Sequence, residues 1–113
     1  MKSNETRYLE EQVKLACVAF EQGNEKQARE HLQQARLLLP CCAAVEVAIA
    51  DVFLQYDKLI LAHAYYLEAT FREPGNARAL RGLKDVESRL AEEIRLRAAN
   101  LTAQPTLFEE YSM

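Results

Sequence analysis

Cysteine and histidine are the residues of this sequence best suited to bind a metal or to act as nucleophiles. Cys41 and Cys42 are adjacent and follow Pro40, while His31 and His63 stand alone. Two thiols separated by two residues would suit metal or redox chemistry, but adjacent thiols do not easily chelate one ion, and no cysteine or histidine nearby completes a set of ligands. We therefore predict no metal site and interpret the cysteine pair as structural thiols at a packed turn.

No other arrangement of reactive residues indicates catalysis. The sequence has no Ser, His and Asp arrangement, no glycine-rich phosphate loop and no pair of carboxylates that would face one cleft. The three cysteines are odd in number and do not suggest a disulfide framework. We predict that the protein is not an enzyme, needs no cofactor and keeps its thiols reduced.

Composition favours one compact helical domain. Of the 113 residues, 50% are apolar and 27% charged, with only three glycines and three prolines. The net charge of −3 and the scattered Lys and Arg residues argue against a nucleic-acid partner. The N-terminus lacks the apolar segment of a secretory signal, and no run approaches the roughly 18 apolar residues of a membrane span. We predict a cytoplasmic protein with no membrane partner.

A 34-residue repeat organises the chain. Shifting the sequence by 34 residues, with no gap, aligns residues of the same kind: Leu15 with Ile49, Ala16 with Ala50, Ala28 with Ala62, Leu32 with Tyr66, Ala35 with Ala69 and Pro40 with Pro74. Small residues allow two helices to cross closely, larger ones fill the space beside the crossing, and proline ends a helix. A 34-residue period holding two helical patterns is typical of a helix-turn-helix solenoid.

These residues resemble the tetratricopeptide repeat family. The resemblance covers residues 9–42 and 43–76 and implies an all-α fold of two repeats plus a long C-terminal capping helix over residues 77–101. The sequence departs from the family pattern at the fourth repeat position, where Gln12 and Glu46 replace the usual aromatic residue. We expect one domain over residues 1–101 and a flexible tail over residues 102–113.

Helical periodicity and capping residues place five helices. We expect them over residues 5–22, 25–39, 44–56, 58–72 and 77–101. Ser3 or Asn4, Asn24, Asp57 and Asn76 are the expected N-terminal caps. The third helix is apolar on every side, so we expect it to lie in the middle of the stack.

The resemblance also implies a binding groove, because first helices of successive tetratricopeptide units line a concave face. From the residues at the contact positions we predict eight that bind the partner: Val13, Cys17, Phe20, Val47, Asp51, Leu54, Arg78 and Arg81. Members that bind the acidic tails of heat-shock chaperones carry Lys, Asn and Arg at positions where this chain keeps only Arg78. The pattern instead favours an apolar floor with a basic end, suited to an amphipathic helix or an extended apolar peptide.

Two alternatives stay open at this point. Val13, Phe20, Val47 and Leu54 could instead belong to the core, and surplus apolar surface could drive self-association into a homo-oligomeric scaffold. The tail holds Leu107, Phe108 and Tyr111 beside two glutamates and could dock in the same groove. The sequence thus predicts an adaptor or small chaperone that binds a segment of another protein, with a structural self-associating subunit as the alternative.

Overall fold

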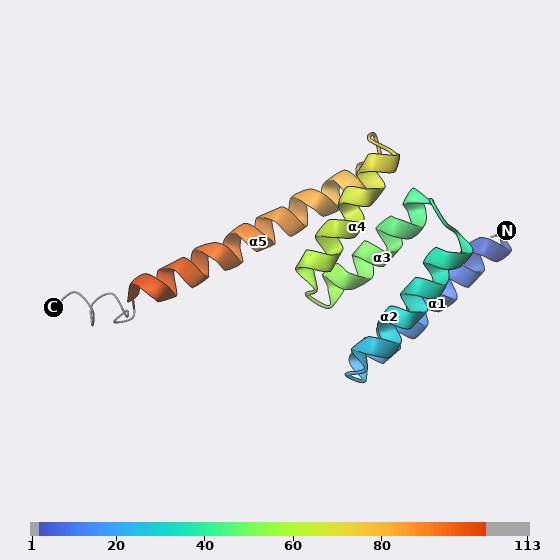
Figure 1. Ribbon diagram of the computed structural model, residues 1–113, viewed down its shortest axis with the longest axis horizontal. Coiled ribbons are helices and arrows are strands. Elements are labelled where there is room, and N and C mark those ends of the chain that lie inside the picture. The colour runs from blue at the N-terminus through green and yellow to red at the C-terminus, as the bar shows by residue number, and fades with distance from the viewer. Residues whose placement is uncertain (1–2, 104–113) are drawn as a thin grey trace.

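The computed structural model describes residues 3–103, which form five α-helices and no strand (Figure 1). The helices are α1 (Asn4–Glu21), α2 (Glu25–Leu38), α3 (Ala43–Gln55), α4 (Leu59–Arg72) and α5 (Ala77–Ala103). The all-α prediction is confirmed. No helix within residues 3–103 combines the length and the apolar character that crossing a membrane requires.

Three of the expected caps are present. The side-chain oxygens of Ser3, Asn24 and Asn76 accept hydrogen bonds from the backbone N–H three residues later, at 3.1, 3.1 and 3.0 Å. Each satisfies a donor that the first turn of a helix leaves without a partner. These caps fix the starts of α2 and α5 where the sequence predicted them, and the start of α1 one residue earlier, at Asn4.

The prediction that Asp57 caps α4 is wrong. Asp57 has a φ of 61°, and Lys58 occupies the capping position without a side-chain hydrogen bond. The corresponding residue of the first hairpin, 34 positions earlier, is Gly23, with a φ of 78°. Both turns need a left-handed residue here, a conformation that aspartate tolerates better than most non-glycine residues.

The helices form two antiparallel hairpins, α1 with α2 and α3 with α4, and α5 packs against α4 (Figure 1). Helix α3 lies between the other elements and contacts all four of them. Eight of its 13 residues are buried, which explains why its sequence is apolar on every side. The predicted central position of this helix is confirmed.

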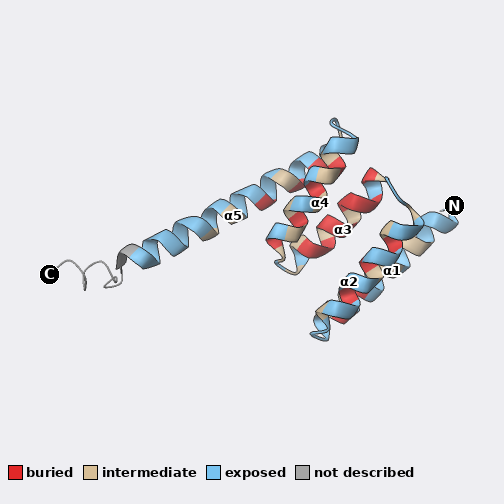
Figure 2. Cartoon of the chain, in the orientation of Figure 1, coloured by how far each residue is buried: buried red, intermediate tan, exposed pale blue. Residues whose placement is uncertain are grey.

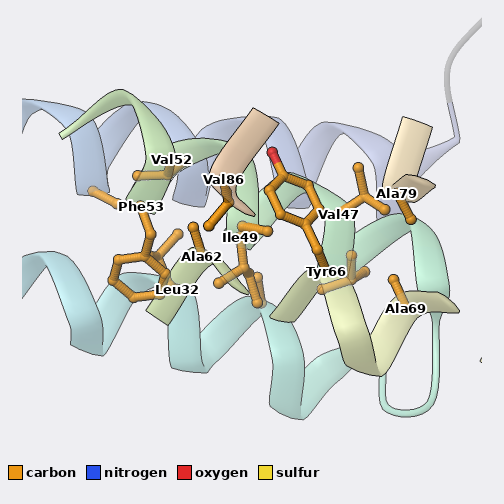
Figure 3. Close-up of a cluster of buried hydrophobic side chains, with 14 of the residues drawn as sticks. Leu32, Val47, Ile49, Val52, Phe53, Ala62, Tyr66, Ala69, Ala79 and Val86 are labelled. Carbon is orange, nitrogen blue, oxygen red and sulfur yellow. The ribbon is translucent and has the colours of Figure 1, made fainter. Parts of the chain in front are cut away.

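Alanines occupy the close helix crossings. Ala16, Ala28, Ala50 and Ala62 are completely buried, as the repeat pattern predicted. Larger side chains, among them Tyr66, fill the space beside them (Figure 3). Because a bulkier residue would force the backbones apart, the alanines set the distance between helices.

Helix α5 extends beyond the four-helix body. Its first half is anchored by the buried Ala79 and Val86, whereas most residues after Leu90 are exposed (Figure 2). The helix continues to Ala103, two residues past the predicted end. The rest of the predicted tail, residues 104–113, lies outside the described residues.

Candidate functional site

A groove of about 550 Å³ opens between α1, α3 and the start of α5. We call it the α1–α3–α5 groove. Three of the sequence-predicted residues, Val13, Asp51 and Arg78, line it. The other lining residues are Leu9, Glu10, Lys14, Ala48, Val52 and Gln55. One surface therefore brings together residues from three helices that are distant in the sequence.

Asp51 joins the groove to the core. Its carboxylate accepts a hydrogen bond from the Tyr66 hydroxyl. It also forms an ion pair with Arg78, in which Arg78 Nη2 lies 2.9 Å from Asp51 Oδ2. Burial raises the pKa of Tyr66, and the hydrogen bond to Asp51 raises it further, so this hydroxyl stays a donor. The negative charge of Asp51 is thus held in place by α4 and α5 at the rim of the groove.

Cys17 and Phe20 connect α1 to α3. The Phe20 ring stacks on Tyr56, with centroids 4.7 Å apart, and meets Phe53 edge to face at 6.2 Å. The Tyr56 hydroxyl donates to the Cys17 carbonyl at 3.2 Å and to Glu21 Oε1 at 3.1 Å. Desolvation and these acceptors raise the pKa of Tyr56 to about 12. Cys17 and Phe20 are half-buried in this contact and are not among the lining residues of the α1–α3–α5 groove.

Val47 requires a correction, because it is only 2% exposed and belongs to the core (Figure 3). The repeat aligns it with Val13, which is half-buried on the outer helix α1. Helix α3 has neighbours on both sides, and there Val47 is enclosed while Ala48 and Asp51 reach the groove. A ligand in the groove would not reach Val47.

Leu54 and Arg81 do not line the groove either. Leu54 is half-buried against the core, and Arg81 is exposed on α5, one turn after Arg78. The structure therefore brings together three of the eight predicted residues and places the other five elsewhere.

Sequence reasoning missed several lining residues that flank the predicted ones. Leu9 lies one helical turn before Val13 on α1, and Ala48, Val52 and Gln55 follow one another at spacings of four and three on α3. This spacing marks one helix face. Helical spacing would have identified Ala48 and Gln55 as lining residues if the orientation of α3 had been known.

The cysteines and histidines do not gather at this groove. Cys41 is exposed, with a φ of 58°, and is therefore not the packed thiol that the sequence predicted. His31 contacts Gln12 Oε1 through Nδ1 at 3.0 Å, which joins α1 to α2. Within residues 3–103, no group of three or more His, Cys, Asp or Glu side chains is placed to hold a metal ion.

Comparisons with protein-family models, with curated proteins and with solved structures find no match to this chain. The likeness to tetratricopeptide repeats therefore rests on the 34-residue spacing of its own residues.

Proposed function

We propose that this chain is a protein-binding adaptor or small chaperone of the tetratricopeptide type, with no enzymatic role, and that it works in the cytoplasm. Its ligand would be an amphipathic helix or an extended apolar peptide held in the α1–α3–α5 groove. The observation that carries this proposal is an open groove of about 550 Å³ with an apolar floor, formed by three helices. Grooves of this kind suit helical or extended segments with regularly spaced apolar anchors.

The side chains around the groove define the ligand more closely. Leu9, Val13 and Ala48 supply apolar surface, whereas Glu10, Lys14, Gln55 and the Asp51–Arg78 pair are polar. Arg78 is already paired with Asp51, but Arg81, which lies outside the groove one turn further along α5, is exposed. We therefore expect apolar anchors in the ligand, with an acidic residue at the end that lies over α5.

Photo-crosslinking in the native cell tests whether the groove holds a ligand. A photoreactive phenylalanine analogue at position 13 should crosslink one or a few proteins, each through a defined peptide identified by mass spectrometry. The same analogue at Gln33, exposed on α2, is the matched control. Equal crosslinking from both positions would contradict a specific groove.

The crosslinked peptide then provides a binding assay. Val13→Glu and Ala48→Glu should each weaken its affinity about tenfold or more, because each places a charge on the apolar floor. Gln33→Glu should leave the affinity unchanged, and circular dichroism should show that all three variants keep their helices. Unchanged affinity in both groove variants would rule the site out.

A structural, self-associating subunit is the second candidate. The exposed apolar side chains on the outer face of α4, which lie away from the groove, favour it.

A further inference from the structure

The outer face of α4 carries an apolar stripe that no described part of the chain covers. The α4 stripe consists of Ile60, Ala64, Leu67 and Phe71, at spacings of four, three and four, which place them on one side of the helix. Ile60 is 77%, Leu67 47% and Phe71 88% exposed. The buried side of α4, with Leu59, Ala62, Tyr66 and Ala69, points the opposite way.

The first hairpin shows that the fold does not require this stripe. The residues 34 positions earlier are Lys26, Glu30, Gln33 and Leu37, and all four are exposed on α2. The same face of the repeat is therefore mostly polar in one hairpin and wholly apolar in the next. Exposed apolar surface of this extent marks a site of association.

We propose that a second copy of this chain covers the α4 stripe, with the two α4 helices packed antiparallel about a two-fold axis. Ile60 and Phe71 lie equally far from the midpoint between Ala64 and Leu67. The axis thus places Ile60 opposite Phe71 of the second copy and Ala64 opposite Leu67 of the second copy. Each large residue meets a complementary one, and Ala64 allows the helices to approach closely.

Charges near the stripe favour this arrangement. Glu68, at its edge, is already engaged within its own chain, where its Oε1 accepts from Arg36 at 3.0 Å and from Arg72 at 3.3 Å. The stripe itself holds no charged residue, so the contact buries no unpaired charge. Antiparallel packing also sets the N-terminal end of each α4 beside the C-terminal end of the other, where the helix dipoles attract.

The described end of α5 runs away from the α4 stripe. Ile94 of α5 lines one groove together with Ile60, and the nine further residues to Ala103 carry the helix about 13 Å away from α4. Phe71 lies about 16 Å from Ile60 in the opposite direction along α4.

Sedimentation velocity over about 1 to 300 µM tests the proposal. Two four-turn helices form a small interface, so we expect a weak dimer whose mass approaches twice 12.9 kDa as the concentration rises. Phe71→Glu should raise the dissociation constant about tenfold or more, because it places a charge in the contact. Leu37→Glu, at the matching position of the first hairpin, should sediment like the wild type. Both sites are exposed, so neither change should unfold the protein.

Several outcomes would overturn the α4 contact. The wild-type chain could stay monomeric at every concentration, or Phe71→Glu could leave the dimer intact. Alternatively, Ile94→Glu on α5 could dissociate the dimer where Phe71→Glu does not. Val13→Glu should leave the dimer unchanged, which separates this contact from the α1–α3–α5 groove. Failure of the groove and failure of the dimer are therefore distinguishable.

Disulfide trapping tests the antiparallel orientation. In a chain whose three native cysteines are replaced by alanine or serine, we expect an equal mixture of Ile60→Cys and Phe71→Cys chains to form a mixed disulfide under mild oxidation. Neither variant alone should crosslink efficiently, because antiparallel packing holds identical positions far apart. Efficient crosslinking of Ile60→Cys alone would point to parallel helices and contradict the two-fold arrangement.

Discussion

Glu46 is a carboxyl group in an unusual position, because only 2% of the residue is exposed. Its Oε1 accepts from Arg72 Nε at 2.5 Å, but its Oε2 is buried without a hydrogen-bond partner. Burial raises the pKa of Glu46, and the neighbouring Glu68 raises it further, against the opposing effect of Arg72. The folded protein therefore binds a proton at Glu46 more tightly than the unfolded chain does.

We predict that Glu46 makes stability depend on pH. Because its pKa is raised on folding, its contribution to stability is fully present below the unfolded pKa and is lost as the pH rises through the folded pKa. As the pH rises above about 4.5, the free energy of unfolding of the wild type should therefore fall relative to that of Glu46→Gln. Urea denaturation at several pH values measures this difference.

Glu30→Gln provides the control for Glu46, because Glu30 is exposed on α2 and lies outside the buried core. The difference between this variant and the wild type should stay nearly constant over the same pH range. A Glu46→Gln difference that is constant, or that grows in favour of the wild type with rising pH, would contradict the raised pKa.

The two polar residues at the fourth repeat position share a structural role. Gln12 hydrogen-bonds His31, and Glu46 pairs with Arg72, so each joins the two helices of its own hairpin. The family pattern has an aromatic residue at this position. Here a polar contact between helices takes its place.

At the scale of helices, Gly82 allows α5 to approach α4. A Cβ atom at position 82 would overlap the ring of Tyr66. The residues 34 positions earlier are Leu32 on α2 and Ala48 on α3. The α4–α5 pair therefore combines a large ring with glycine, whereas the equivalent α2–α3 pair combines a smaller leucine with alanine.

We predict that Gly82 and Tyr66 are coupled in stability. Gly82→Ala should lower the free energy of unfolding by about 1 to 3 kcal/mol through overpacking, although alanine favours a helix by about 1 kcal/mol. Adding Tyr66→Leu reproduces the Leu32 and Ala48 combination and should recover part of that loss. A double-mutant cycle measured by urea denaturation gives the coupling.

Tyr66→Leu alone is the necessary third variant in this cycle. It should be destabilising, since it leaves space beside Gly82 and removes the hydrogen bond to Asp51. If the effects of the two single changes add within about 0.5 kcal/mol, the two side chains do not limit each other and the prediction fails.

The sequence predicted the helices better than it predicted their orientation. Ser3, Asn24 and Asn76 could be identified as caps because a short polar side chain before a helix is a local signal. Asp57 carries the same local signal, yet it occupies the left-handed position of its turn. Val47 was misplaced because the repeat equates it with Val13. The sequence placed α3 in the middle of the stack, but it did not show which residues of α3 the neighbouring helices enclose.

At the scale of the whole molecule, the two hairpins are held together by a limited set of contacts. The Phe20 stack on Tyr56 and the ion pairs Lys58–Glu25 at 2.8 Å and Arg36–Glu68 at 3.0 Å join the first hairpin to the second. Helices α3 and α4 contact each other far more extensively. In repeat architectures, stability is approximately the sum of each unit and its interfaces with neighbours.

We therefore predict that the α1–α2 hairpin opens before the rest of the body. In native-state hydrogen exchange, buried amides of α3 and α4 should show the highest opening free energies, those of α1 and α2 lower ones, and residues 95–101 of α5 the lowest. Phe20→Ala should lower the opening free energy of α1 and α2 by about 1 to 3 kcal/mol, because it removes both ring contacts with α3 and its turn.

The same variant decides whether the hairpins are separate cooperative units. In the Phe20→Ala variant, the backbone amides of α4 and α5 should keep their protection from hydrogen exchange. The contacts of Tyr66, Gly82, Asp51 and Arg78 hold these helices in place without Phe20. Leu96→Ala, on the exposed part of α5, should change neither group. An equal loss of protection in all helices would mean that the body unfolds as one unit. The interface between the hairpins would then be as strong as the hairpins themselves, contrary to what its few contacts indicate.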